Sequence, residues 1–319
     1  MHKVLVTRKI PEDGLNLLRQ NYEVEVWEDD LPIPHEILKE KIKDVSGLLC
    51  LLSDRIDKEI LYEARELKVI ANYAVGYDNI DIKYAGDRGI FVGNTPDVLT
   101  ETTADLAFAL LMACARRLKE GIEYVSEDKW MTWGPQLLLG HDIFGATIGI
   151  IGFGRIGQAV ARRAKGFGMK VLYSGWSRKE SLEKELDVEY SSIENLLKNS
   201  DFISLNCKLT ADSENLIDKD AFETMKENAI LVNTARGKVV NTDDLYNALK
   251  TGKIFAAGLD VTDPEPLRSN HKLLELSNCI VVPHIGSASF STRKKMSVIS
   301  ANNIIDGING NKPGFCVNL

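Results

Sequence analysis

The sequence predicts an α/β protein built from two doubly wound parallel sheets. Two observations lead to this fold class. Short apolar segments rich in valine and isoleucine alternate with amphipathic segments of helical period, and this alternation occurs twice along the 319 residues. A chain of this length also exceeds what one hydrophobic core usually organises, so two domains are expected.

The first series of alternating segments covers the amino-terminal third of the chain. Its helices are expected to begin near Pro11, Pro34, Asp57 and Asp81, because proline and aspartate suit the first turn of a helix. Its expected strands are residues 4–7, 24–27, 47–52, 69–72 and 90–93.

The second series supplies six further strands, which is enough for a complete doubly wound sheet. These strands are expected at residues 147–151, 170–174, 202–206, 230–233, 256–260 and 280–282. A last helix, from about residue 289 to residue 308, can cross back to the first domain. The chain is therefore expected to form one discontinuous domain of residues 1–99 and 286–319, and a second domain of residues 100–285.

A long apolar helix is expected at residues 100–117, between the two series. The stretch that follows, residues 121–145, contains Trp130, Trp133 and the leucines of residues 137–139, and it is too apolar for a linker. It forms either a loop packed on its own domain or a contact between subunits. We favour a homodimer whose interface uses both stretches.

Composition limits the classes of partner. A formal charge of -7 and a pI near 5.4 argue against DNA, RNA or an acidic membrane as the main partner. The five cysteines lack the spacing of a metal or redox motif, so we expect no metal site. Because the amino terminus lacks a signal-peptide pattern and no apolar run reaches membrane-spanning length, we expect a cytoplasmic protein.

A glycine-rich motif, G-F-G-R-I-G at residues 152–157, follows an expected strand and precedes an expected helix. Gly152 permits the tight turn, Gly154 lets the backbone approach a pyrophosphate, and Gly157 lets the helix pack closely on its strand. The alternative is a tight turn with no ligand. The motif predicts a dinucleotide site that includes Gly152, Gly154, Arg155, Ile156 and Gly157.

The choice between NAD and NADP depends on the end of the second strand of this series. NAD-selective sites place an acid about twenty residues after the motif begins, because a carboxylate accepts the ribose 2′-hydroxyl. This chain has no acid there before Glu180, and instead offers Ser174, Ser177 and Arg178. We therefore expect NADP(H) to be preferred and NAD(H) to be possible, although a solvated basic turn would give the same pattern.

Three side chains suited to the reduction of a 2-keto acid each follow an expected strand of the second series. The reaction needs a proton donor, a cation for the carboxylate and a hydride source. His284, with Glu265 as its carboxylate partner, can supply the proton donor, and Arg236 can supply the cation. The carboxyl ends of parallel strands lie at one edge of a sheet, so these three side chains are expected near one another. Each alone could be a surface or core residue. Together with the glycine motif they predict a dehydrogenase.

Four segments in this order resemble the signatures of the D-2-hydroxyacid dehydrogenase family: the glycine motif, A-R-G at 235–237, D-V-T-D-P-E-P at 260–266 and P-H-I-G-S at 283–287. The likeness covers essentially the whole chain and is greatest to the glyoxylate/hydroxypyruvate reductase branch. It implies a flavodoxin-like substrate domain and a Rossmann dinucleotide-binding domain.

The resemblance also implies roles for individual residues. His284 would be the general acid, Glu265 would hydrogen-bond to it and favour the protonated imidazole, and Arg236 would hold the substrate carboxylate. The backbone N–H groups of Val75 and Gly76 would complete the carboxylate site. The remaining expected contacts are Ser287 with the substrate, and Thr234 and Asp260 with the cofactor.

The implied activity is NAD(P)H-dependent reduction of glyoxylate or hydroxypyruvate to the 2-hydroxy acid, and the residues do not rank these two substrates. Trp176 stands where reductases of this branch often carry an arginine, which weakens the preference for NADP. Two alternatives stay open: an NAD-dependent dehydrogenase of another D-2-hydroxy acid, and a dinucleotide-sensing binding protein of the same fold without catalysis.

Overall fold

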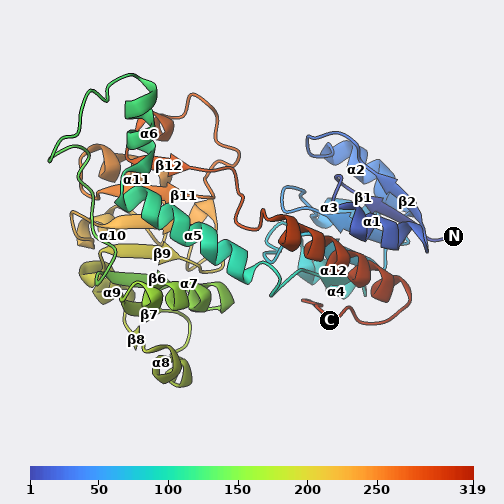
Figure 1. Cartoon of the computed structure of the whole chain (residues 1–319). Helices are drawn as coiled ribbons and strands as arrows, with labels where there is room; N and C mark the ends of the chain where they lie inside the picture. The colour runs from blue at the N-terminus through green and yellow to red at the C-terminus, as the bar shows by residue number, and fades with distance from the viewer. The chain divides into compact units, whose positions relative to one another are not determined.

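The computed structural model describes residues 1–319, which divide into two compact units. Residues 1–99 and 287–319 form the first unit, and residues 100–286 form the second. Each unit is a parallel sheet with helices on its faces (Figure 1). Gly286, which the expected boundary assigned to the first domain, lies in the second unit, where its N–H bonds to the Asp260 carboxylate at 2.8 Å.

The first unit contains a five-stranded sheet in which every neighbouring pair is parallel. Its order, β2-β1-β3-β4-β5, is that of flavodoxin-like folds. The strands are β1 (Lys3–Val6), β2 (Glu23–Val26), β3 (Gly47–Cys50), β4 (Val69–Asn72) and β5 (Phe91–Gly93).

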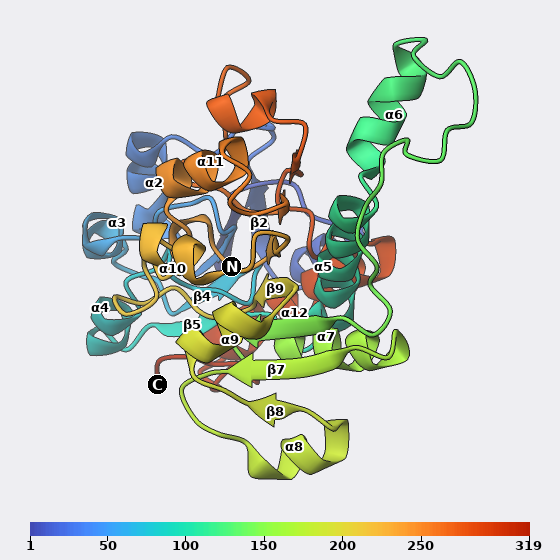
Figure 2. The ribbon, with the colours of Figure 1, turned by 90° about the vertical axis from the view of Figure 1, so that its left-hand side faces the viewer.

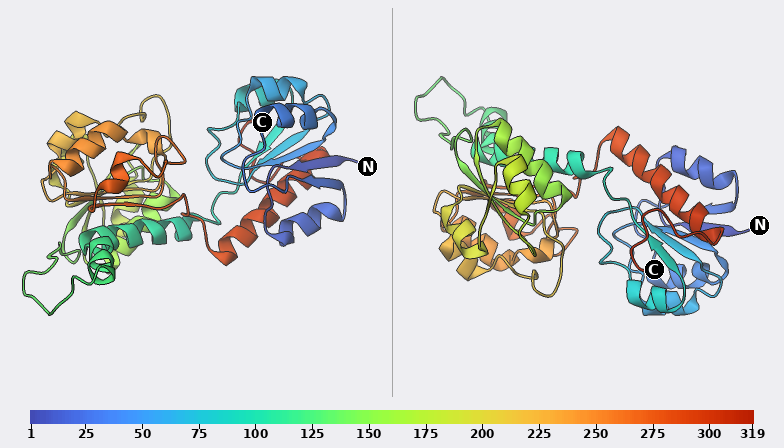
Figure 3. Two further views of the ribbon diagram at one scale, coloured as in Figure 1. Left: turned by 90° about the horizontal axis from the view of Figure 1, so that it is seen from above. Right: turned by 90° about the horizontal axis from the view of Figure 1, so that it is seen from below.

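Helices from both ends of the chain cover the first sheet (Figure 3). The last of these helices, α12, packs closely on β4 and on α1. A Cβ at Gly307 of α12 would lie 2.4 Å from the Val69 Cβ of β4, and a Cβ at Gly14 of α1 would lie 2.3 Å from the Ser297 carbonyl oxygen of α12. The carboxyl-terminal helix therefore packs on the sheet of the first unit, as expected. The helices are α1 (Glu12–Arg19), α2 (His35–Lys41), the 3-10 turn η1 (Ile42–Asp44), α3 (Lys58–Glu63), α4 (Ile82–Asp87) and α12 (Phe290–Ile308).

The second unit contains a seven-stranded parallel sheet of order β12-β11-β10-β9-β6-β7-β8, the Rossmann arrangement continued by one strand. Six of the strands were expected. The seventh, β8, was missed because it has two residues, both exposed, and so carries no apolar signal. The strands are β6 (Thr147–Ile151), β7 (Lys170–Ser174), β8 (Glu189–Tyr190), β9 (Phe202–Leu205), β10 (Ile230–Asn233), β11 (Ala256–Leu259) and β12 (Cys279–Val281).

Two apolar cores lie on the two faces of this sheet. One core includes residues of α5 and α7, and the other includes residues of α9, α10 and α11. The helices are α5 (Thr100–Ala115), α6 (Leu118–Ser126), α7 (Arg155–Gly166), α8 (Glu180–Leu186), α9 (Ile193–Asn199), α10 (Lys219–Thr224) and α11 (Thr242–Lys250), with 3-10 turns η2 (Gly237–Val239) and η3 (Lys272–Glu275). No helix in the chain has both the length and the apolar character needed to cross a membrane.

The helix expected at residues 100–117 ends earlier and is buried by its own unit. Arg117 has a left-handed φ of 50°, which separates α5 from α6. Phe108 and Leu111 are 5% and 1% exposed, and Leu110 packs on β11, where a Cβ at Gly258 would lie 2.9 Å from its Cβ. Most apolar side chains of α5 are therefore covered within their own domain, which leaves Met112, 38% exposed, for the expected subunit interface. The interface itself stays a prediction.

The exposed apolar side chains lie further along the chain, on α6 and the segment after it, which project from the body of the second unit (Figure 2). Part of the stretch expected to be a loop is thus helical. We call this set the α6 apolar surface: Leu118, Ile122, Val125, Trp130, Met131, Trp133, Leu137 and Leu139.

Candidate active site

The glycine motif forms the turn between β6 and α7. Gly152 has a φ of +95°, and a Cβ there would lie 2.5 Å from the backbone nitrogen of Cys207. A Cβ at Gly157 would lie 2.2 Å from the Gly152 carbonyl oxygen, so both positions exclude any larger residue. Gly154 differs, since a Cβ there would meet no atom within 4 Å, and it precedes α7 without a side-chain cap. The helix amino terminus therefore faces open space and offers its N–H groups to an anion.

Two buried polar atoms near this turn have no hydrogen-bond partner in the chain. They are Oγ1 of Thr234 and Oδ1 of Asn206, which follow β10 and β9 at matched positions of the sheet. A Cβ at Gly152 would also lie 2.6 Å from the Asn206 carbonyl carbon, so these strand ends adjoin the glycine turn. Buried polar atoms without partners are rare unless a ligand or water satisfies them. The site thus fits a nucleotide, with a phosphate cradle and polar groups beside it.

The loop after β7 is organised around Glu183. This carboxylate accepts hydrogen bonds from Nε and Nη2 of Arg178, at 2.9 and 2.8 Å, and from the Tyr173 hydroxyl at 2.8 Å. The same hydroxyl accepts the N–H of Lys179 at 2.7 Å. The hydrogen bond to Glu183 raises the pKa of Arg178 above its ordinary value. Arg178 is therefore paired within this loop, although its side chain is 56% exposed.

The other residues of this loop differ in exposure. Ser174 is 5% exposed at the end of β7, and its carbonyl accepts the N–H of Gly152 at 2.8 Å. Ser177 is exposed, and Trp176 is 78% exposed. The end of β7 is tied to the glycine turn by this backbone bond and by the ring of Tyr173, which stacks on that of Phe153 with 4.1 Å between their centroids.

Arg236, Glu265 and His284 follow three neighbouring strands, β10, β11 and β12, whose last residues are in register. Their loops pack directly on one another, because a Cβ at Gly237 would lie 1.9 Å from the carbonyl oxygen of Thr262. The structure thus brings the three predicted catalytic residues to the carboxyl edge of one sheet, which also carries the glycine turn.

His284 and Glu265 form a pair, with His284 Nδ1 2.6 Å from Glu265 Oε1. Both side chains are partly exposed, at 24% and 35%. Since an ionised carboxylate only accepts, Nδ1 carries the shared proton and Nε2 is left for another partner. This is the arrangement of a base or acid whose ring is oriented by a second group.

The backbone of His284 is held by Asp260. His284 has a φ of +53°, and its N–H bonds to the Asp260 carbonyl oxygen at 2.9 Å. The buried carboxylate of Asp260 accepts the N–H groups of Ile285 at 2.6 Å and Gly286 at 2.8 Å. Burial raises the pKa of Asp260. Asp260, expected to contact the cofactor, thus has both carboxylate oxygens bonded to the loop that carries His284.

Asn233 has the same function for the loop of Arg236, and sequence reasoning missed it. Its side chain is 1% exposed, and it bonds to the carbonyl oxygen of Arg236 at 2.9 Å and to the N–H of Ala235 at 3.0 Å. Arg236 also donates from Nη1 to the Ala235 carbonyl at 2.8 Å. The available signal was a polar residue at the end of a fully buried strand.

The expected substrate residues outside the second unit lie in the first. Val75 and Gly76 follow β4 and are partly exposed, and Ser287 lies just before α12, where its carbonyl accepts the Ser289 N–H at 2.9 Å.

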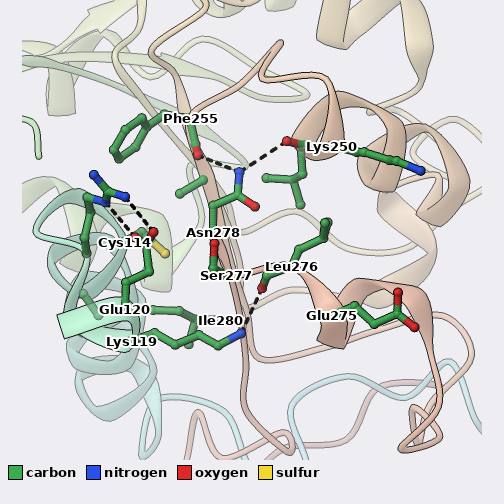
Figure 4. A pocket seen from close by; sticks show the side chains of 14 residues that line it. Cys114, Lys119, Glu120, Lys250, Phe255, Glu275, Leu276, Ser277, Asn278 and Ile280 are labelled. Carbon is green, nitrogen blue, oxygen red and sulfur yellow. Dashed lines mark hydrogen bonds and ion pairs between the residues drawn. The ribbon is translucent and has the colours of Figure 1, made fainter. Parts of the chain in front are cut away.

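A cavity of about 450 Å³ in the second unit lies elsewhere. It is lined in part by residues at the amino ends of β11 and β12 (Figure 4), whereas Glu265 and His284 follow the carboxyl ends of these strands. Two of its cations are paired within the chain, since Lys119 donates to two carbonyl oxygens, at 2.9 and 3.1 Å, and Arg117 donates to Glu120.

Comparison with known proteins places the chain in a family. Residues 108–286 match the model of the D-isomer specific 2-hydroxyacid dehydrogenase NAD binding domain. The chain belongs to this family, and it is an oxidoreductase with a nicotinamide dinucleotide cofactor.

Relatives within the family agree over their whole length. The chain is 51% identical to a glyoxylate reductase of Thermococcus onnurineus, covering 99% of this chain and 96% of that protein. It is 50% identical to the human glyoxylate reductase/hydroxypyruvate reductase, covering 97% and 95%. A solved NADPH-dependent glyoxylate/hydroxypyruvate reductase of Sinorhizobium meliloti, in complex with NADP and malonate, matches with a TM-score of 0.87 and 30% identity, covering 99% and 96%.

Proposed function

We propose that this protein reduces glyoxylate and hydroxypyruvate to the corresponding 2-hydroxy acids, with His284 as the proton donor. The observation that carries the proposal is the His284–Glu265 pair, with 2.6 Å between Nδ1 and Oε1, at the sheet edge that carries the glycine turn. The names of the relatives supply the substrates. The geometry of the pair supports His284 as the acid.

Each of the three residues has a separate task in this reaction. The reduced nicotinamide supplies a hydride to the carbonyl carbon when it is bound. Arg236 binds the substrate carboxylate and stabilises negative charge on the carbonyl oxygen. His284 transfers the proton from Nε2 to that oxygen, and Glu265 keeps the ring oriented and stabilises its protonated form before transfer. The product is the 2-hydroxy acid, and the imidazole is left neutral.

The N–H groups of Val75 and Gly76 and the side chain of Ser287 are the remaining groups that we assign to the substrate. Two backbone N–H groups suit a carboxylate, because they give two hydrogen bonds without a mobile side chain. We assign Thr234 to the cofactor, and its unpartnered buried hydroxyl supports this role. Asp260 contributes by holding the His284 loop.

NADPH is the preferred cofactor in this proposal, and NADH is accepted. The end of β7 carries Ser174 and no carboxylate that could accept a ribose 2′-hydroxyl. Arg178 follows in the same loop, where Nε and Nη2 bond to Glu183 and Nη1 can donate to a phosphate. Glu183 partly offsets the charge of that guanidinium. The preference for the 2′-phosphate should therefore be moderate and should depend on Arg178.

A homodimer built on the α6 apolar surface belongs to the same proposal. Trp130, Met131 and Trp133 are 61%, 87% and 79% exposed, and a contiguous set of this kind usually marks an interface. The surface lies on a projecting segment, so a second copy can cover it without displacing the core of the second unit. Sedimentation should give a dimer that dissociates when Met131 and Leu139 are replaced by lysine. A monomer of 35.5 kDa at micromolar concentration would overturn this assignment.

The activity is tested with a panel of 2-keto acids and both cofactors. We expect saturable oxidation of NADPH with glyoxylate and hydroxypyruvate, and weaker oxidation of NADH. The dinucleotide-sensing alternative predicts that the cofactor binds and that no 2-keto acid consumes it. Turnover only with NADH and another 2-keto acid would instead favour a different dehydrogenase of the same family.

A further inference from the structure

The loop after β4 has an unusual pattern of carbonyl hydrogen bonds. The Ala74 carbonyl accepts the backbone N–H of Thr95 at 2.9 Å, and the Val75 carbonyl accepts Nδ2 of Asn94 at 2.8 Å. Consecutive carbonyls of an extended chain point to opposite sides. Here two consecutive carbonyls bond to the same short segment, 94–95, so both point to the same side.

This pattern fixes the direction of two N–H groups. A trans peptide is planar, and its N–H points opposite to its C=O. The N–H of Val75 shares a peptide with the Ala74 carbonyl, and the N–H of Gly76 shares one with the Val75 carbonyl. Both N–H groups therefore point away from segment 94–95, on the same side of the loop. Neighbouring N–H groups with a common direction form a concave anion site.

The side chain of Asn94 turns the Val75 carbonyl to the same side as the Ala74 carbonyl, and Asn94 is itself held by several hydrogen bonds. Its side chain is 6% exposed. Its backbone N–H bonds to the Phe315 carbonyl at 3.2 Å, and its carbonyl accepts Nδ2 of Asn303 at 3.0 Å. Asn303 is 2% exposed on α12, so the anchor extends into the core of the first unit.

A second asparagine anchors the other end of the loop. Asn72 occupies the position on β4 that matches Asn94 after β5, because Ala71 pairs with Gly93. Asn72 is fully buried and donates to the Gly76 carbonyl at 2.8 Å and to Oδ1 of Asn79 at 3.0 Å. The peptide planes on both sides of Gly76 are thus set by buried amides.

We propose that Asn94, supported by Asn72, is a positioning residue that aims the N–H groups of Val75 and Gly76 at the substrate carboxylate. The inference rests on the proposed function for the identity of that carboxylate. Without the Asn94 amide, the Val75–Gly76 peptide can rotate, and the two N–H groups no longer share a direction. The substrate would then lose binding while the cofactor would not.

The test compares Asn94→Leu and Asn94→Asp with wild type, using steady-state kinetics and calorimetric binding of oxamate to the NADPH complex. Leucine removes the amide, and aspartate keeps the shape but cannot donate when ionised. We expect the KM for glyoxylate and the Kd for oxamate to rise together by about tenfold or more, the scale of a lost charge-assisted hydrogen bond. The KM for NADPH should stay within about twofold, and kcat should fall less than KM rises.

Asn318→Leu is the matched control. Asn318 also ties the backbone of the first unit, donating to the Ile90 carbonyl at 2.8 Å and accepting the Val92 N–H at 2.9 Å, at the opposite end of β5. The Asn318→Leu variant should have a lower free energy of unfolding and an unchanged KM for glyoxylate.

The outcomes separate the inference from the function. Wild-type KM and oxamate affinity in both Asn94 variants, with turnover intact, would overturn the inference and leave the function standing. An equal rise in KM for Asn318→Leu would also overturn it, since the effect would then be general destabilisation. Absence of turnover in wild type, with oxamate binding that still depends on Asn94, would overturn the proposed function alone.

Discussion

Replacing Gly237 by alanine tests whether the loops of Arg236 and Glu265 act as one rigid unit. The new Cβ would lie 1.9 Å from the Thr262 carbonyl oxygen and 2.1 Å from the Thr262 carbonyl carbon. A carbon and an oxygen that are not bonded approach to about 3.3 Å, so the loops must separate by about 1.4 Å. Both contacts are with backbone, which cannot rotate away as a flexible side chain can.

This displacement gives the expected magnitude. A misplacement of about 1 Å between catalytic groups costs roughly a hundredfold in rate, so kcat/KM for glyoxylate should fall by about that factor. The overpacked contact should also lower the free energy of unfolding by about 1–3 kcal/mol. Affinity for NADPH should change little, because the glycine turn lies on β6 and α7 and is not part of this contact. Steady-state kinetics, fluorescence titration with NADPH and thermal unfolding measure the three quantities.

Gly166→Ala is the control for this experiment. Gly166 is the last residue of α7, and a Cβ there would meet no atom within 4 Å. The variant should keep wild-type kinetics and gain about 1 kcal/mol or less of stability from helix propensity. Wild-type kcat/KM in Gly237→Ala, in a protein that is measurably destabilised, would show that the spacing of the two loops does not set the rate.

Three further predictions concern the proton donor, the cofactor and stability. His284→Gln should lower kcat with glyoxylate by about a hundredfold or more and leave the Kd of NADPH nearly unchanged; retained turnover would mean that another group donates the proton. Arg178→Ala should raise the Kd of NADPH more than that of NADH, whereas equal losses would exclude contact with the 2′-phosphate. The hydrogen bond from Arg117 lowers the pKa of Glu120 below its ordinary 4.5, so the pair stabilises the fold above that pH and the contribution is lost as the pH falls. Glu120→Gln should therefore lower the free energy of unfolding by about 1 kcal/mol at neutral pH, and this difference should shrink as the pH falls below 4.5. A pH-independent difference in the unfolding curves would contradict this.

The fold class and the family were predictable because they depend on local patterns. A parallel strand buried on both faces reads as a short apolar run, and all eleven expected strands are present, including β2, which alternates glutamate and valine. Topology then places residues that follow neighbouring strands at one edge. Arg236, Glu265 and His284 lie together for this reason, and no knowledge of side-chain contacts was needed to expect it.

The covering of apolar surface was less predictable. The sequence shows that α5 is apolar on most sides, but it does not show whether the chain itself or a second subunit covers it. In the structure Phe108 and Leu111 pack against the second unit's own core, and the exposed apolar side chains lie on α6 and beyond. Which surface covers a helix depends on non-local packing, which a periodicity alone does not determine.

The sequence did not show which residues hydrogen-bond to the backbone of the site loops. A buried polar residue at a strand end can bond to several backbone groups. The path of the loop decides which group it meets. Asn233 bonds to the loop of Arg236, and Asn94 bonds to the carbonyl of Val75. Both contacts could be found only from coordinates, although a polar side chain after an apolar strand is a signal that such a contact exists.

Asp260 shows why these contacts matter for the chemistry. A histidine with a φ of +53° is in a sparsely populated region of backbone conformation, which persists only where the surroundings enforce it. Asp260 enforces it from both sides, because its carbonyl oxygen accepts the N–H of His284 and its carboxylate accepts those of Ile285 and Gly286. Glu265 can orient the ring only because the backbone beneath it is fixed. The backbone of His284, the proposed proton donor, is therefore held by contacts along the β11–β12 edge.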